Sequence, residues 1–210
     1  MSIAPVPELV AELAAGHLIY HGNPDYAGAD QFRWTGSDGN AFSTQSVFTN
    51  ITLANVNDGP LLEAGANRSV QEGHWLDQGL TLGDPDVGNS YLITVDWGYS
   101  VGGVPVTQTF TTGAKNPFIS HIFPDNGSYT VTVTVNDQQG QANSIETDSF
   151  TVTVDNVAPT LALTGDNTVE QGHVYTLTLG NVVDSGTDTV SQYTIDWGDG
   201  SPAQTIAAAD

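Results

Sequence analysis

The chain has 210 residues and a formal net charge of −21, because 24 acidic residues face only three basic ones. This charge repels nucleic-acid phosphates and offers no basic surface to anionic lipid, which argues against nucleic-acid binding and membrane-surface docking. No disulfide can form because the chain lacks cysteine, and no apolar run is long enough to cross a membrane.

Residues 7–15 are the only stretch that suits a helix. Leu9, Val10 and Leu13 would share one helical face, and Gly16 stands where a helix would end. A first strand or an irregular lead-in fits these residues equally well. The first 15 residues lack a basic region followed by an apolar one, so they do not read as a signal peptide.

From residue 18 onward the pattern is that of strands and turns. Phe32 and Trp34 alternate with polar neighbours, and residues 47–53 supply a return strand. Between them, residues 37–40 predict a hairpin turn in which Asp38 is a turn former rather than a ligand. Residues 55–60 then break the pattern and are interpreted as a linker.

The clearest strands lie between residues 60 and 158. Tyr91, Ile93, Val95 and Trp97 share one face, and the same alternation runs through residues 129–135 and 150–154. Strict alternation predicts strands with one packed and one solvated face. Short strands separated by Gly, Asn and Asp turns favour an antiparallel β-sandwich.

Landmarks of this region return about a hundred residues later, so one structural unit is used in tandem. Residues 95–98 (Val-Asp-Trp-Gly) return at 195–198, and the segment at 70–74 returns at 169–173. The counterpart of residues 110–154 does not follow Trp197. We therefore divide the chain into residues 1–59 (later strands only), 60–158 (a complete sandwich) and 159–210 (earlier strands only).

Two family resemblances sharpen this division. Residues 61–158 and the start of the next copy resemble the polycystic-kidney-disease (PKD) domain, through Asp96-Trp97-Gly98 and the segment from Ser120 to Val131. Residues 18–58 resemble the closing half of a bacterial cadherin-like repeat, through residues 26–32, 37–39 and 56–60. Both resemblances imply tandem immunoglobulin-like antiparallel β-sandwiches in long extracellular or cell-surface proteins, often adhesins. They specify the fold more strongly than any ligand.

The repeated Asp-Trp-Gly motif allows two interpretations. Exposed indoles stack on sugars, but Trp97 and Trp197 continue the apolar face of alternating strands, so we predict that both are buried. The glycine after each indole is expected to relieve backbone crowding. His121 is predicted to form a structural hydrogen bond between strands, and His74 and His173 to be surface turn residues. No nucleophile, base and helper stand together, so we expect no enzymatic activity.

Carboxylates at the joints between units are the candidate ligands. Calcium takes six to eight oxygens from flexible loops, and a joint brings the loops of two units together. The predicted ligands of the first joint are Asn57, Asp58, Glu72, Asp84 and Asp86, and those of the second are Asp155, Asn156, Glu170, Asp184 and Asp188. Ordinary turn capping by Asp and Asn is the alternative explanation.

The sequence therefore predicts a non-catalytic structural or adhesive spacer of a large extracellular repeat protein, with Ca²⁺ stiffening its joints. Neighbouring repeats are its expected partners, together with a cell-surface or polymer ligand. The alternative is an accessory polymer-binding module of a secreted depolymerase. In that case exposed aromatic residues would contact the polymer, with Trp75, Tyr99 and Tyr26 as the candidates.

Overall fold

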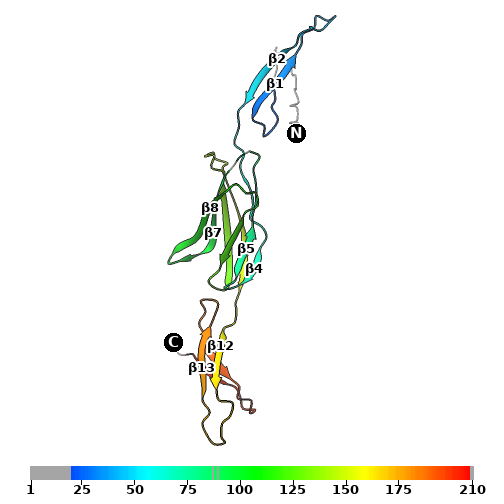
Figure 1. The fold of residues 1–210 in the computed structure, drawn as a ribbon. Helices are drawn as coiled ribbons and strands as arrows, with labels where there is room; N and C mark the ends of the chain where they lie inside the picture. Colours follow the sequence, from blue (N-terminus) through cyan, green and yellow to red (C-terminus); the bar gives the residue numbers. More distant parts are fainter. Residues whose placement is uncertain (1–19, 87, 89, 209–210) are drawn as a thin grey trace.

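The computed structural model describes residues 20–208 except 87 and 89, so the helix or strand considered for residues 7–15 lies outside the described residues. The described residues form fifteen strands and no helix, and the predicted all-β fold class is confirmed. The strands belong to three units that follow one another in a row (Figure 1). In the described part of the chain, no helix has the length and apolar character needed to span a membrane.

The first unit is a single antiparallel pair. Strand β1 (Gly28–Trp34) pairs with β2 (Val47–Leu53) along its whole length. In the loop between them, the Asp38 Oδ1 atom accepts hydrogen bonds from the N–H groups of Asn40 and Ala41, both at 2.9 Å. The predicted turn-forming role of Asp38 is confirmed.

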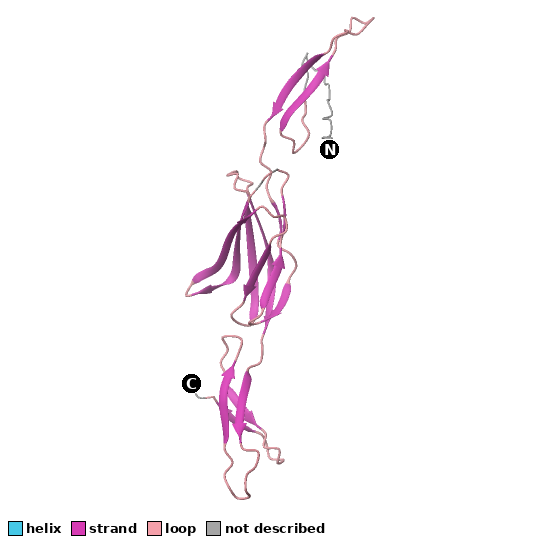
Figure 2. Ribbon diagram, viewed as in Figure 1, coloured by secondary structure: helices cyan, strands magenta, loops and turns pink. Residues whose placement is uncertain are grey.

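The middle unit is a two-layered sandwich. Its strands are β3 (Leu61–Glu63), β4 (Arg68–Gln71), β5 (Trp75–Gly79), β6 (Thr81–Gly83), β7 (Tyr91–Val101), β8 (Val104–Thr112), β9 (Phe118–Ile122), β10 (Gly127–Asn136) and β11 (Ile145–Asp155). One layer is a sheet with the order β4-β11-β10-β7-β8, in which only the β4–β11 pair is parallel. The pairs β3–β6 and β5–β9 form the other layer (Figure 2).

The core lies between these two layers, as strand alternation predicts. Ile93, Val95 and Trp97 of β7 are buried. Alternate residues from Val131 to Val135 of β10 and from Phe150 to Val154 of β11 are buried beside them. Leu76 of β5 and Ile119 of β9 close the core from the other layer. The sixteen residues of the buried hydrophobic core all lie between Ala64 and Val154. Among the described residues, the middle unit therefore contains the only hydrophobic core.

The Asp-Trp-Gly motif lies at an irregularity within strand β7, where its pairing with β8 changes register between Asp96 and Ser100. The Gly98 N–H donates to Asp96 Oδ1 at 2.9 Å, and Gly98 has a φ of +80°. A Cβ at Gly98 would lie 2.4 Å from the carbonyl oxygen of Thr130 on β10. Gly98 therefore permits both a left-handed backbone and a close approach of two strands, which confirms the predicted relief of crowding after Trp97. After Trp197 the prediction is wrong, since a Cβ at Gly198 would meet no atom within 4 Å.

The third unit consists of two separate strand pairs. Its strands are β12 (Thr160–Gly165), β13 (Leu177–Val183), β14 (Gln192–Ile195) and β15 (Gln204–Ala207). Strand β12 pairs with β13 and β14 with β15, and an open apolar groove of about 440 Å³ lies between the pairs. The prediction that Trp197 is buried is wrong, since its side chain is 51% exposed. The Trp97 indole is covered by His121 of β9 and by Phe123, whereas no described residue of the third unit covers Trp197 in this way.

Candidate functional site

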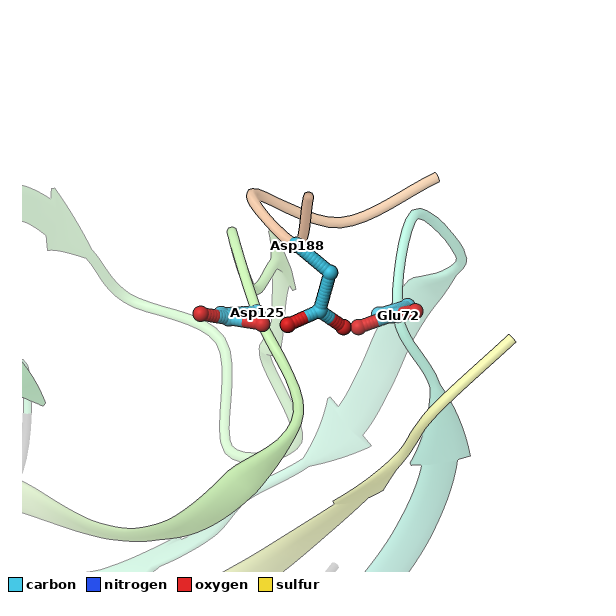
Figure 3. Close-up of side chains that lie close together, drawn as sticks. All are labelled: Glu72, Asp125 and Asp188. Atoms are coloured by element: carbon cyan, nitrogen blue, oxygen red, sulfur yellow. The ribbon is translucent and has the colours of Figure 1, made fainter. Parts of the chain in front are cut away.

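Three carboxylates meet where the middle and third units touch. Glu72, Asp125 and Asp188 come from three separate loops and point toward one another (Figure 3). One oxygen of each lies within 4.8 Å of the others. Two oxygens bound to opposite sides of one Ca²⁺ would be about 4.6–5.2 Å apart, so a calcium ion fits among these groups.

Glu72 is the innermost of the three. It follows strand β4, and its side chain has no exposed surface. Its Oε1 atom accepts a hydrogen bond from the Val157 N–H at 2.7 Å, but its buried Oε2 atom has no hydrogen-bond partner. A buried carboxylate oxygen without a partner is costly, because the desolvation of its charge is not compensated. A cation would remove this cost.

Asp125 lies in the turn between β9 and β10. Its main-chain carbonyl accepts a hydrogen bond from the Tyr129 hydroxyl at 2.8 Å, which fixes the turn against the core. Its Oδ2 atom accepts a hydrogen bond from the Thr187 hydroxyl of the third unit at 2.7 Å. Asp125 therefore connects the two units directly.

The loop from Asp184 to Asp188 supplies the third unit's side of the site. A Cβ at Gly186 would lie only 2.6 Å from Glu72 Oε2, so glycine allows the loop to approach the buried carboxylate. The Asp184 Oδ1 atom is buried and has no hydrogen-bond partner. Burial raises the pKa of Asp188, and the charges of Asp125, Glu72 and Asp184 raise it further.

Asn156 in the linker completes the group. With its amide nitrogen turned inward, it donates to Glu72 Oε1 at 3.2 Å and to Asp188 Oδ2 at 2.6 Å. With its side-chain oxygen turned inward, Asn156 would offer a further oxygen ligand beside the same two carboxylates. Asp184 lies outside the three-carboxylate cluster, but it is near enough for its charge to raise the pKa of Asp188. If Asp184 and Asn156 joined the three carboxylates, five side-chain oxygens would be available, and water or main-chain oxygens would complete the coordination number that calcium requires.

The first joint carries a similar but differently bonded set of acids. The Asp58 N–H donates to Asp86 Oδ2 at 2.8 Å, and the Asp86 N–H donates to Asp84 Oδ1, also at 2.8 Å. These bonds are the turn capping considered as the alternative to metal binding. Burial raises the pKa of Asp58, with further contributions from the charges of Asp25, Asp86 and Asp84.

Unpartnered oxygens remain at this joint too. Asn57 Oδ1 and Asp84 Oδ2 are buried without a hydrogen-bond partner, although the Asn57 amide nitrogen donates to Asp137 Oδ2 at 3.0 Å. Within the described residues, the four buried side-chain atoms without a partner are all oxygens, and two lie at each joint. Neither Asn57 nor Asp84 is fully buried, whereas the Glu72 side chain is.

The structure corrects the assignment of three predicted ligands. Glu72 was predicted at the first joint but lies at the second, because β4 runs toward the third unit. Asp155 ends strand β11 and accepts a hydrogen bond from the Ser69 hydroxyl at 3.4 Å. Glu170 is exposed and lies 3.4 Å from His173. Neither Asp155 nor Glu170 belongs to the cluster of three carboxylates.

A one-residue offset in the repeat explains the error at Glu170. The His74 N–H donates to the Gln71 carbonyl, and the His173 N–H donates to the Glu170 carbonyl. Glu170 is therefore equivalent to Gln71, and Gln171 occupies the position of Glu72.

Asp25 and Asp125 were not among the predicted ligands. Each directly follows a proline and stands two or three residues before the first strand of a hairpin, β1 or β10. This shared position was the signal that could have identified them.

The remaining candidates have clear positions. His121 Nε2 lies 2.9 Å from the Tyr99 hydroxyl, and its ring stacks on Trp97 with centroids 4.3 Å apart. The predicted inter-strand hydrogen bond is confirmed, and burial lowers the pKa of His121. Tyr99 is consequently not an exposed contact residue. Tyr26 is 38% exposed and donates its hydroxyl hydrogen to the Ala29 carbonyl, whereas Trp75 is 64% exposed.

Comparison with known families identifies the middle unit. Residues 57–154 match the family model of the PKD domain, which is an immunoglobulin-like β-sandwich found typically in extracellular and surface proteins. The match confirms the resemblance of the complete unit. The cadherin-like first unit and the second PKD copy lie outside the matched residues and stay predictions. No curated protein matches the chain.

Proposed function

We propose that this chain is a non-catalytic spacer segment of a large extracellular repeat protein, and that calcium stiffens its second joint. The observation that carries the proposal is Glu72, a fully buried carboxylate with an unpartnered oxygen at the contact between two units. The PKD match supports a structural or adhesive role for the middle unit. Neighbouring repeats are the partners that this role requires.

The proposed ion would bind five side chains from two units and their linker. The middle unit contributes Glu72 and Asp125, the linker Asn156, and the third unit Asp184 and Asp188. Because the ligands come from both sides, the ion would hold the units in one relative orientation. Without it, like charges would oppose the contact and the joint would bend more freely.

The stabilisation expected from calcium binding is small, but it is enough to affect the joint. Extracellular modules bind calcium with dissociation constants of about 10⁻⁴–10⁻³ M. An ion present at about ten times its dissociation constant adds roughly 1.4 kcal/mol by mass action. For a small domain this corresponds to a rise of roughly 5–11 °C in melting temperature. Contacts between domains of one chain are themselves weak, so such a term would change the flexibility of the joint.

The test combines thermal unfolding with small-angle scattering in millimolar calcium and in chelator. Calcium should raise the melting temperature and reduce the spread of conformations, and Glu72→Gln should remove both effects. Glu146→Gln is the matched control, because it removes one exposed carboxylate from β11, outside the joint. Superimposable melting and scattering curves with and without calcium would refute calcium stiffening.

A second candidate function is polymer binding by an exposed face of the β5–β9 pair. Trp75 lies opposite Ile122, and Phe118 lies opposite Gly79 on the same face, so these side chains share one solvent-exposed surface. Trp75 and Phe118 are 64% and 73% exposed. A flat surface with aromatic rings is a common means of contacting a polysaccharide or a fibrous protein.

Pull-down on insoluble chitin, cellulose and collagen tests this second function. Trp75→Ala should abolish retention if this face binds the polymer. Trp34→Ala is the control, because Trp34 is a similarly exposed indole, at 52%, in the first unit. If neither the unaltered chain nor the control variant is retained, polymer binding by this face is excluded for these three polymers.

A further inference from the structure

The third unit lacks a core of its own. Of the described residues from 159 to 208, none is buried, and apolar side chains such as Leu163 and Tyr175 are 53% and 40% exposed. Isolated two-stranded pairs are marginally stable in water. The two pairs of this unit, β12–β13 and β14–β15, therefore have little internal stability to keep them folded.

The contact with the middle unit depends on the loop that contains the proposed ligands. Thr187 donates to Asp125, Gly186 lies against the Glu72 carboxylate, and a Cβ at Gly73 would lie 3.1 Å from Ser185 Cβ. The middle unit's side of this contact is fixed by a buried core, as the Tyr129–Asp125 hydrogen bond shows. The third unit's side has no such support.

We infer that cation binding at the second joint is coupled to the folding of residues 159–208, so that the ion orders the third unit as well as orienting it. This inference rests on the calcium site proposed above. The preformed half of the site, Glu72 and Asp125, would capture the ion, and the loop with Asp184 and Asp188 would close over it. Closure would fix the loop that joins β13 to β14, so that both strand pairs are held at the end that faces the middle unit. Without the ion, acidic repulsion works against this placement.

Hydrogen exchange of the full chain, read by mass spectrometry, tests the coupling. Calcium at ten times its dissociation constant should slow exchange in peptides from β12 to β15 about tenfold, because binding to the closed form lowers the open population by that factor. Peptides from β7 and β10 in the core of the middle unit should not change. Terbium luminescence or calorimetry measures binding of the ion independently.

Two variants separate the possible causes. Glu72→Gln should remove the calcium effect on residues 160–207 while leaving protection of β7 and β10 intact. Gly186→Ala keeps every charge but places a methyl group against the Glu72 carboxylate, and it should also remove the effect.

Three outcomes would overturn the inference. If calcium binds but protection of the third unit does not change, the coupling is wrong and the stiffening proposal stands. If protection rises equally in Glu72→Gln, the ion acts elsewhere and the coupling is wrong. If neither calcium nor terbium binds at millimolar concentration, the proposed site fails as well.

Discussion

Gly98 and Gly103 form a matched pair that isolates the cost of a steric clash. Both belong to the β7–β8 hairpin region, and their φ angles are +80° and +81°. A Cβ at Gly103 would meet no atom within 4 Å, whereas a Cβ at Gly98 would lie 2.4 Å from the Thr130 carbonyl oxygen and 3.0 Å from its C and N atoms. Alanine at either position adds the same backbone strain, but only alanine at Gly98 collides with β10.

The expected magnitudes follow from these two terms. A left-handed backbone costs an alanine about 1–2 kcal/mol, which is the whole effect expected for Gly103→Ala. Gly98→Ala adds an overpacking term of about 1–3 kcal/mol, because β10 must move away from β7 by most of an ångström. We therefore expect total losses of roughly 1–2 kcal/mol for Gly103→Ala and roughly 2–5 kcal/mol for Gly98→Ala.

Urea unfolding followed by tryptophan fluorescence measures both losses, since Trp97 stands next to Gly98 in the core. The free energy of unfolding of the middle unit should fall more for Gly98→Ala than for Gly103→Ala. If the two variants differ by less than about 0.5 kcal/mol, which is within the usual spread of harmless surface substitutions, the close approach of Thr130 does not explain the motif glycine.

Two further predictions concern the same core. Trp97→Ala should lower the middle unit's free energy of unfolding by about 3–5 kcal/mol, because its indole is 1% exposed. Trp197→Ala should leave that free energy unchanged, because its indole is 51% exposed. Similar losses for the two variants in urea unfolding would contradict the structure. Burial lowers the pKa of His121, so the unfolded chain binds this proton first as the pH falls. Stability of the middle unit should therefore be complete above about pH 6.5 and decrease below it, and His121→Gln should weaken that decrease. Urea midpoints between pH 5 and 8 check this, and identical slopes for the two proteins would count against it.

The strands of the middle unit could be predicted because their signal is local. Val131, Val133 and Val135 alternate with threonines, and this pattern needs only one buried face to be interpreted correctly. Whether an indole is buried, in contrast, depends on residues far away in the sequence. Trp97 and Trp197 have the same neighbours in sequence, but strands far along the chain cover only Trp97, as its contacts with His121 and Phe123 show.

The joint site was predicted in part, since Asn156, Asp184 and Asp188 do lie together with other acids at the second joint. Glu72 was misplaced because the repeat shows that a turn recurs, but not at which end of the sandwich it lies. The parallel pairing of β4 with β11 decides that, and parallel pairing leaves no mark in the alternation of either strand.

The same parallel pairing has a mechanical consequence. The chain enters the middle unit beside the first joint and leaves it at the end of β11, so pulling on the two neighbours drags β4 and β11 in opposite directions along their length (Figure 1). The ladder from Arg68–Val152 to Gln71–Asp155 is then sheared, and its hydrogen bonds must rupture together rather than peel apart one after another. Under tension, the β4–β11 pair should be the last part of the middle unit to separate. Force spectroscopy should therefore show one peak of high unfolding force for the middle unit.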